Sequence, residues 1–359
     1  MTFLSARRRF ASYEEALVRS CYRILLGREP DASVTRVQRA APIKADEEQR
    51  FREILLGVIQ SDEFNARYAG LVSKPLMPVG DLVRGSRVEV EDRIRALCQA
   101  TYLGDGVALC RALGRFHMFV HTSDVGFATH VMHSGIWEMP LTEFMVRTIK
   151  PKMRVLDIGA NYGYYSLLMA DLVQGDGLCQ TFEPNPKVAQ LLKRSLSVNG
   201  FESRSRVWEI ALSNSNEDSV NFFVPHNEPK NGHLVADVDD ARLNDGYFTK
   251  VAMRSPNSLA SELGRIDFMK IDAEGAEIHI IDSMRDILRE QRPVMVVEVN
   301  CARYDAVPML QSLSDIYGSV NFIGHDGYSH PTSIEEVTTL NFGFDWLIHF
   351  DPQVSAAAR

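Results

Sequence analysis

The pattern of hydrophobic and polar positions changes along the chain, from helical spacing at the start to alternating short runs later. Residues 16–25 carry apolar side chains at helical spacing, and residues 51–59 repeat the pattern after a break at residues 27–31 (GREPD). Apolar residues that recur every three or four positions form one face of an amphipathic helix. No strand pattern accompanies them, so residues 1–72 are predicted to form a small all-α domain.

Residues 73–115 separate this helical domain from the rest of the chain. Pro75, Pro78, Gly80 and Gly85 punctuate their first part, and such residues favour turns over continuous elements. Residues 91–113 return to a helical pattern. We therefore expect a linker followed by a helix.

Residues 116–352 have the pattern of an α/β domain. Strands that alternate with helices predict a mostly parallel sheet with helices on both faces, as in Rossmann-like folds. The last apolar run, residues 344–350, follows no helix of crossover length and predicts an antiparallel final strand. The other predicted strands are residues 155–158, 179–182, 207–211, 268–271 and 294–299, with helices that end near residues 172, 198 and 288.

Composition and charge argue against several classes of function. The 359 residues carry 39 basic and 47 acidic side chains, a net charge of −8, whereas general nucleic-acid binding needs clustered positive charge. No nucleic-acid partner is therefore expected. The five scattered cysteines form no CxxC pair, which favours reduced thiols over a zinc site. Neither a signal peptide nor a transmembrane run is evident, so we expect a cytoplasmic location.

The strongest candidate for chemistry is the segment 155–163 (VLDIGANYG), in which a strand leads into a glycine-rich turn and a helix. Glycines permit positive φ and a close approach of the backbone to a ligand. The helix N-terminus offers unpaired N–H groups to a carboxylate. This order suits the amino-acid end of S-adenosylmethionine, with Asp157 for its amino group. The candidate binding residues here are Asp157, Gly159, Asn161 and Gly163.

A dinucleotide-binding fold would need glycines at other positions. Counted from Gly159, the G-x-G-x-x-G pattern would put its second and third glycines at Asn161 and Tyr164. Without them, the turn does not readily admit a pyrophosphate. We therefore favour a methyl donor, with a nicotinamide-dependent dehydrogenase and a tight turn without any ligand as the alternatives.

Two further segments extend the predicted donor site. Glu183 follows the next strand within residues 182–186 (FEPNP), where a carboxylate can accept both hydroxyls of a ribose. Asn185 suits the N-cap of the following helix, so it has a structural interpretation beside its candidacy for binding. Ala211 closes the third strand, where this fold holds adenine, although an ordinary strand end explains it equally well.

Residues 269–277 (MKIDAEGAE) supply candidates for catalysis. Asp272 lies at the carboxyl end of a predicted strand, where open α/β sheets bind ligands, and is the first choice as general base or substrate ligand. Glu274 is the second candidate, although carboxylates in a first helical turn are also stabilised by the helix dipole. His133 is a third candidate base, near Trp137, which could stack on a sugar ring.

A metal site is a less favoured alternative. Asp272, Glu298 and Asn300 would lie at the mouths of neighbouring strands, and their oxygen atoms would suit Mg²⁺. Their spacing is not a specific metal signature, so the prediction is a site without metal.

Residues 116–350 resemble the FkbM family of methyltransferases. This resemblance implies a class I methyltransferase fold, S-adenosylmethionine as the donor, and O-methylation of a hydroxyl, commonly on a sugar or a polyketide-type metabolite. The long polar segment 225–246 is interpreted as an acceptor-binding loop or lid, or else as a surface insertion. The matching segments, in order, are residues 135–138 (GIWE), 157–166 (DIGANYGYYS), 182–186, 211–213 (ALS), 270–277 and 293–298.

Residues 13–70 resemble a bacterial helical domain of unknown function, through residues 22–31 (YRILLGREPD) and 61–64 (SDEF). That domain often accompanies proteins of cell-surface glycans, which implies a glycan or small-molecule acceptor. The leading hypothesis is an S-adenosylmethionine-dependent O-methyltransferase acting on a sugar hydroxyl of a glycan or glycolipid. The alternative from another class is a non-catalytic protein that holds the donor while its N-terminal helices recruit a protein partner.

Overall fold

The computed structural model describes residues 15–26, 28–31, 54, 57–58, 61, 63, 76–235, 245–340 and 343–352. Contacts divide the chain into two compact units, Met1–Pro75 and Leu76–Arg359. Residues 76–115, which the sequence assigns to a linker and a helix, therefore belong to the second unit. Within the described parts of the chain, no helix is long and apolar enough to cross a membrane.

The first unit is helical where it is described. Residues 15–21 form an α-helix that continues into a π-helical turn, η1 (Tyr22–Leu26). Val18, Cys21 and Leu26 pack against Ile54 and Val58 in a small core. Of the apolar positions whose spacing predicted a helix, Cys21 is buried and Leu17 and Leu25 pack against this core, whereas Ala16 is exposed.

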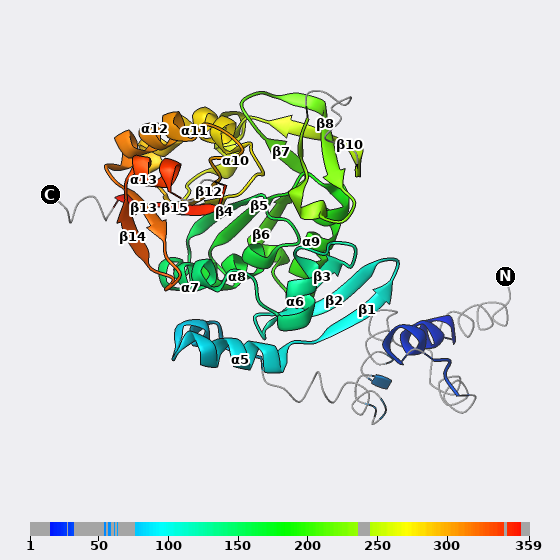
Figure 1. Ribbon diagram of the computed structural model, residues 1–359. Helices are drawn as coiled ribbons and strands as arrows, with labels where there is room; N and C mark the ends of the chain where they lie inside the picture. Colours follow the sequence, from blue (N-terminus) through cyan, green and yellow to red (C-terminus); the bar gives the residue numbers. More distant parts are fainter. Residues whose placement is uncertain are drawn as a thin grey trace. The chain divides into compact units, whose positions relative to one another are not determined.

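The second unit is built on an eight-stranded sheet with the order β14-β13-β15-β12-β11-β4-β5-β6 (Figure 1). Strands β6, β5, β4, β11 and β12 run parallel, while β15 is antiparallel to both of its neighbours. The predicted antiparallel last strand is therefore confirmed. The bounds are β4 (Arg154–Ile158), β5 (Leu178–Phe182), β6 (Ser205–Trp208), β11 (Phe268–Ile271), β12 (Val294–Val299), β13 (Val320–Ile323), β14 (Ser329–Thr332) and β15 (Trp346–Phe350).

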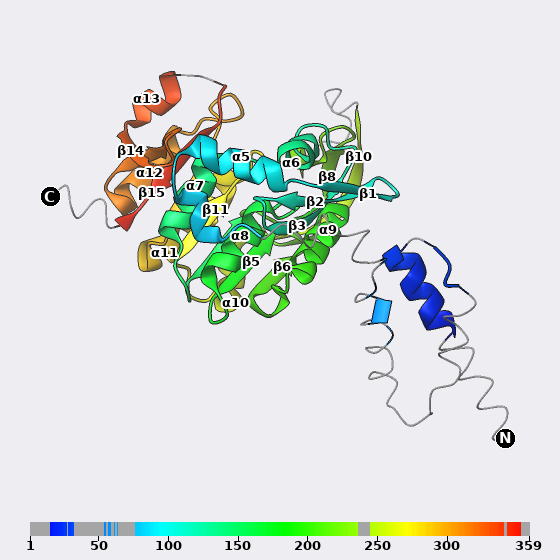
Figure 2. The same cartoon turned by 90° about the horizontal axis from the view of Figure 1, so that it is seen from below.

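Helices cover both faces of this sheet, because successive side chains of each strand point to opposite sides (Figures 1 and 2). Val155 faces a core shared with α7, α8 and α9, whereas the next residue, Leu156, faces a core shared with α11 and α12. This three-layer arrangement confirms the expected Rossmann-like α/β fold. The helix bounds are α7 (Met139–Thr148), α8 (Tyr164–Val173), α9 (Pro186–Val198), α10 (Ala260–Leu263), α11 (Glu277–Gln291), α12 (Val307–Tyr317) and α13 (Ile334–Thr339).

The segment before the sheet differs from its prediction. Helix α5 (Arg87–Leu97) ends early, and a three-stranded antiparallel sheet follows, so the predicted helix over residues 91–113 is wrong from residue 98 onward. The decisive signal was Asp105-Gly106, where both residues have positive φ (50° and 73°), the conformation that a tight hairpin turn requires. The elements are β1 (Ala100–Gly104), β2 (Val107–Ala112), β3 (Phe116–His121) and α6 (Ala128–Ser134), preceded by η2 (Val79–Val83).

A second sheet, with the order β7-β10-β8-β9, fills the long interval before β11. The single strand predicted over residues 207–211 is divided between β6 in the main sheet and β7 in this second sheet. The polar segment 225–246 connects strands of the second sheet, and its residues 236–244 lie outside the described residues. The bounds are β7 (Ile210–Leu212), β8 (Glu217–Pro225), β9 (His233–Leu234) and β10 (Gly246–Arg254), with short turns η3 (Glu202–Arg204), η4 (Pro229–Asn231) and η5 (Pro256–Leu259).

Candidate active site

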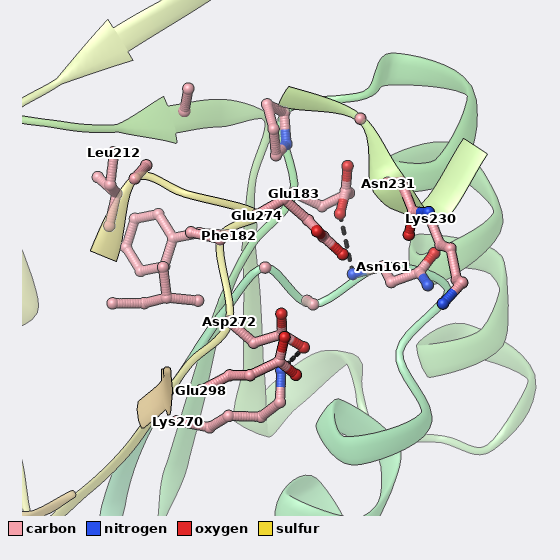
Figure 3. A pocket seen from close by; sticks show the side chains of 18 of the residues that line it. Asn161, Phe182, Glu183, Leu212, Lys230, Asn231, Lys270, Asp272, Glu274 and Glu298 are labelled. Atoms are coloured by element: carbon pink, nitrogen blue, oxygen red, sulfur yellow. Dashed lines mark hydrogen bonds and ion pairs between the residues drawn. The ribbon is translucent and has the colours of Figure 1, made fainter. Parts of the chain in front are cut away.

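A cavity of about 340 Å³ lies at the carboxyl ends of β4, β5, β11 and β12 (Figure 3). The chain leaves β4 toward β5 on one side, whereas β11 lies on the other side, and open α/β sheets bind ligands at such a reversal of strand order. Residues from the second sheet and from the segment before α7 complete its walls. The topology therefore brings together segments that are distant in sequence.

The turn between β4 and α8 is held by glycines at positions where a side chain would collide. Gly159 has a φ of 76°, and a Cβ there would lie 1.6 Å from the carbonyl oxygen of Asp272. Gly163 has a φ of 93°, and a Cβ there would lie 2.3 Å from Leu192 Cδ1 on α9. Gly159 and Asn161 line the cavity, whereas Gly163 packs behind it. The glycine motif thus serves backbone packing as well as ligand access.

Glu183 lies at the end of β5 and is almost fully buried. Its two carboxylate oxygens accept hydrogen bonds from the backbone N–H groups of Asn161 (2.9 Å) and Asn185 (2.8 Å). Burial raises the pKa of Glu183 to about 7, against the opposing effect of these hydrogen bonds. Each oxygen keeps a further lone pair, so the carboxylate can also accept hydrogen bonds from a ligand in the cavity.

Beside Glu183 the cavity has an apolar slot. The ring of Phe182 stacks on Trp208 with 5.7 Å between ring centres, and Ala211 and Leu212 line the slot with Ile280 from α11. Asn185 does not line the cavity but caps α9 by accepting a hydrogen bond from Lys187 N. We call Gly159, Asn161, Glu183, Phe182, Ala211 and Leu212 the donor end of the cavity.

The opposite end is rich in carboxyl groups, which lie on four separate segments. The Lys270 ammonium group lies 3.0 Å from Asp272 Oδ2, and the hydroxyl of Tyr165 donates a hydrogen bond of 2.7 Å to Glu138 (Figure 3 shows the lysine contact). Arg303 lies 3.0 Å from Glu274, 3.5 Å from Glu298 and 3.9 Å from Asp345. We call this group the acidic end: Glu138, Asp272, Glu274, Glu298 and Asp345, with Lys270 and Arg303.

The crowding of carboxyl groups changes their protonation. Burial and the neighbouring Asp272 raise the pKa of Glu298 and so favour its protonated form. Burial and Asp272 also raise the pKa of Glu274, to about 7, against the effect of Arg303. Burial likewise raises the pKa of Glu138, even though its side chain keeps surface exposed to the cavity. The acidic end therefore holds at least one proton that a ligand can use as a hydrogen-bond donor.

Asp157 lies beneath the glycine turn and does not line the cavity. It is fully buried, accepts a hydrogen bond of 2.5 Å from Ser166 Oγ, and has its other oxygen 3.8 Å from Lys270 Nζ. Burial raises the pKa of Asp157, and the Lys270 charge opposes this effect. Its contact with any ligand therefore passes through Lys270 or the turn rather than through an exposed carboxylate.

Two other candidates lie outside the cavity. His133 is exposed on α6 and is not among the cavity-lining residues. The carbonyl oxygen of the Asn300 side chain accepts a hydrogen bond from Ala302 N, and its amide donates to Asp345, so Asn300 does not join Asp272 and Glu298 as a ligand. Among the described residues, no group of three or more His, Cys, Asp or Glu side chains is arranged to hold a metal ion.

Several lining residues were missed by the sequence analysis, namely Lys270, Arg303, Glu138 and Asp345. Lys270 left a signal, because it is a charged residue in the middle of a short strand that is otherwise apolar and fully buried. A buried lysine needs a carboxylate partner, and Asp157 and Asp272 were both already candidates. Arg303 follows β12 and Asp345 precedes β15, and neither belongs to a motif that would have identified it.

Residues 157–321 match the model of the methyltransferase FkbM domain. This part of the chain is an FkbM domain. The match covers the glycine turn, Glu183, the second sheet and most of the acidic end.

Solved structures similar to this chain include methyltransferases from three bacteria. The methyltransferase FkbM from Methylobacillus flagellatus KT shares 14% identity at a TM-score of 0.36, over 59% of this chain and 53% of that one. An S-adenosylmethionine-dependent O-methyltransferase from Thermotoga maritima shares 10% identity at a TM-score of 0.35, over 68% of this chain and 77% of that one. The C-terminal domain of precorrin-6Y C5,15-methyltransferase from Rhodobacter capsulatus shares 13% identity at a TM-score of 0.33, over 60% of this chain and 89% of that one. The chain thus spans about half the length of the first of these structures. No curated protein matches the chain.

Proposed function

We propose that the protein is an S-adenosylmethionine-dependent O-methyltransferase that methylates a sugar hydroxyl of a glycan or glycolipid. One observation carries this proposal: a single cavity of an FkbM domain is lined both by the donor end and by the acidic end. A methyl donor and an acceptor hydroxyl must meet in one enclosed space, because orientation supplies much of the acceleration of such a reaction.

The residues of the donor end fit S-adenosylmethionine. When bound, this group supplies a methyl attached to a positively charged sulfur. Glu183 has lone pairs for both ribose hydroxyls, and the apolar slot beside Phe182 and Leu212 suits the adenine ring. The side-chain oxygen of Asn161 is buried without a hydrogen-bond partner, so it is available to the amino group of the donor.

The acidic end suits a neutral acceptor with several hydroxyl groups. Ionised carboxylates accept hydrogen bonds from hydroxyls, and the protonated Glu298 can donate one. Trp137 lines the same cavity and offers an aromatic face to a sugar ring. The resemblance of the N-terminal helices to a domain associated with glycans supports the same acceptor class.

Asp272 is the proposed general base. The acceptor oxygen forms a bond to the methyl carbon as the carbon–sulfur bond breaks, and the hydroxyl proton passes to the Asp272 carboxylate. Lys270 holds that carboxylate in position at 3.0 Å. Burial and Asp272 raise the pKa of Glu298 and favour its protonated form, so Glu298 is less suited than Asp272 to accept the proton. Glu274, with a pKa of about 7, is the second candidate.

The proposal also extends to the setting of the enzyme. All five cysteines are free, which supports a reducing compartment, and we propose the cytoplasm. The N-terminal helices are proposed to recruit a protein partner. No metal is assigned a role.

Calorimetric titration with S-adenosylmethionine and, separately, with NAD tests the donor assignment. We expect the methyl donor alone to bind, and Glu183→Ala to weaken it by about 10- to 100-fold, since hydrogen bonds to a charged group are lost. Glu209→Ala is the matched control, because Glu209 is an exposed carboxylate outside the cavity. Binding of NAD in place of the methyl donor would support a dehydrogenase and contradict the proposal.

Labelled methyl transfer to a panel of glycans, glycolipids and polyketide-type alcohols tests the acceptor assignment. We expect label on a neutral glycan or glycolipid. Label on a polyketide-type alcohol alone would leave the methyltransferase assignment intact but contradict the sugar acceptor. Tight donor binding without transfer to any class would favour the non-catalytic binding protein.

A further inference from the structure

Three cationic side chains line the cavity, and they differ in their partners. Lys270 lies between Asp157 and Asp272, and Arg303 contacts three carboxylates. Lys230 forms no ion pair within the described parts of the chain, and its ammonium group lies 5.3 Å from the ring centre of Trp137. An anionic group of a ligand would therefore meet one cation without a carboxylate at ion-pair distance, whose charge acts at longer range on Asp124, Glu138 and Glu274.

Lys230 is carried by η4, in the connection from β8 to β9, which we call the strap (residues 226–232). The strap is attached to the segment before α6, because the backbone N–H of Val125 donates a hydrogen bond of 3.0 Å to the carbonyl of Asn227. A Cβ at Gly126 would lie 2.9 Å from Lys230 Cε, so the glycine leaves room for the lysine stem. These contacts aim the lysine into the cavity rather than into solvent.

Lys230 and Asn161 line the same cavity (Figure 3), and Phe127, which follows Gly126, stacks on Tyr162 of the glycine turn with 5.8 Å between ring centres. The first turn of α8 begins there, and the N-terminus of a helix favours negative charge. The acidic end is unfavourable for an anion, because its five carboxyl groups outnumber its two cations and both cations already contact carboxylates. A carboxylate in this cavity is therefore best accommodated between Lys230 and the glycine turn.

We infer that Lys230 binds the amino-acid carboxylate of the methyl donor and so orients the donor in the cavity. This inference rests on the proposed function, since it presupposes that S-adenosylmethionine or its product is the ligand. It gives the second sheet a role, namely to deliver one cation across the mouth of the donor end. It also assigns part of the polar segment 225–246 to donor binding rather than to acceptor binding.

A pair of ligands that differ in this carboxylate tests the inference. S-Adenosylhomocysteine carries the carboxylate, whereas 5′-methylthioadenosine has the same adenosine and thioether without the amino-acid group. Lys230→Met should weaken S-adenosylhomocysteine by about 10- to 100-fold, the range for a lost charge-assisted hydrogen bond, and leave 5′-methylthioadenosine unchanged. Lys230→Arg, which keeps the charge, should recover most of the affinity.

Lys187→Met is the matched control. Lys187, like Lys230, lies over an aromatic ring, with its ammonium group 4.6 Å from the centre of Tyr247 on the second sheet, but it is exposed to solvent and does not line the cavity. The Lys187→Met variant should bind S-adenosylhomocysteine and 5′-methylthioadenosine with the affinities of the wild type. Unchanged binding of 5′-methylthioadenosine also shows that the Lys230 variant is folded.

Two results overturn the inference alone: equal binding of S-adenosylhomocysteine by Lys230→Met and wild type, or equal weakening of both ligands. Failure of the wild type to bind S-adenosylmethionine and S-adenosylhomocysteine at all would overturn the proposed function together with it.

Discussion

The two ends of the cavity are built in different ways. At the donor end, the lining groups come from three short segments, after β4, at the end of β5 and in β7, and backbone N–H groups of Asn161 and Asn185 hold the Glu183 carboxylate. At the acidic end, side chains from four separate segments share two cations, Lys270 and Arg303. The donor end is thus a local motif held by backbone geometry, whereas the acidic end exists only as a tertiary assembly of charges.

This difference has an energetic consequence. A backbone cradle is sensitive to sterics, because the chain has no other conformation available at the turn. A cluster of buried charges is sensitive to protonation, because removing or adding one charge changes every neighbour. The three predictions below test this contrast, from the largest expected effect to the smallest.

Gly159→Ala should have the largest effect. The new Cβ would lie 1.6 Å from the carbonyl oxygen of Asp272, and the φ of 76° disfavours any residue with a side chain. We expect the free energy of unfolding to fall by about 3 kcal/mol or more, with loss of donor binding. Denaturant unfolding and calorimetry measure both effects. Gly175→Ala is the control, because nothing lies within 4 Å of a Cβ there; equal stability of the two variants would refute the steric argument.

Asp272→Asn should lower the rate of methyl transfer while leaving donor affinity almost unchanged, and so distinguish the roles of the two ends. It keeps the shape of the side chain but removes the proposed proton acceptor, and loss of a general base costs about 100-fold or more in rate. Donor affinity should change far less, because the groups that hold the donor lie at the other end. Single-turnover methyl transfer measures the rate, and calorimetry measures the donor affinity. A variant that loses donor affinity as strongly as rate would show that the two ends do not act separately.

A change of pH should alter donor binding by less than these two substitutions alter stability and rate. Burial raises the pKa of Glu183 to about 7, and only the ionised carboxylate has every lone pair free to accept the ribose hydroxyls. Affinity should therefore fall as pH falls through 7, by about 10-fold at pH 6, where about one molecule in eleven is ionised. Titrations between pH 6 and 8 measure this change.

Two variants show which carboxyl group causes the pH dependence of donor affinity. Glu183→Gln should abolish it, whereas Glu274→Gln should leave it in place, although Glu274 has a similar pKa of about 7. If Glu274→Gln abolished the dependence instead, the acidic end would control the donor.

The same contrast explains which elements could be predicted. Strands β4, β5, β6, β11 and β12 of the main sheet and the antiparallel β15 were predicted because each is a short apolar run with one structural interpretation. The second sheet and the hairpin of β1 and β2 were missed, since their strands are partly exposed and mixed in composition. Asp105-Gly106 marked one of these turns and was not used.

The predicted site residues also fall into two groups, those that line the cavity and those that do not. Gly159, Asn161, Glu183 and Ala211 line the donor end, and Asp272 and Glu274 line the acidic end, as their positions after strands suggested. Asp157, Gly163 and Asn185 lie behind the cavity and support it, and His133 lies outside it. A motif identifies which residues are near a ligand, but not which of them face it.

By itself, the sequence determined the class of fold, the turn after β4 and the order of residues along the donor end, because hydrophobic periodicity and glycine sterics act over short distances. Only the tertiary structure decided that Glu138, Glu298, Arg303 and Asp345 meet Asp272, and that Lys230 reaches the cavity from the second sheet. Electrostatic interactions depend on distances in space, and residues that are far apart along the chain acquire those distances only when the sheet assembles.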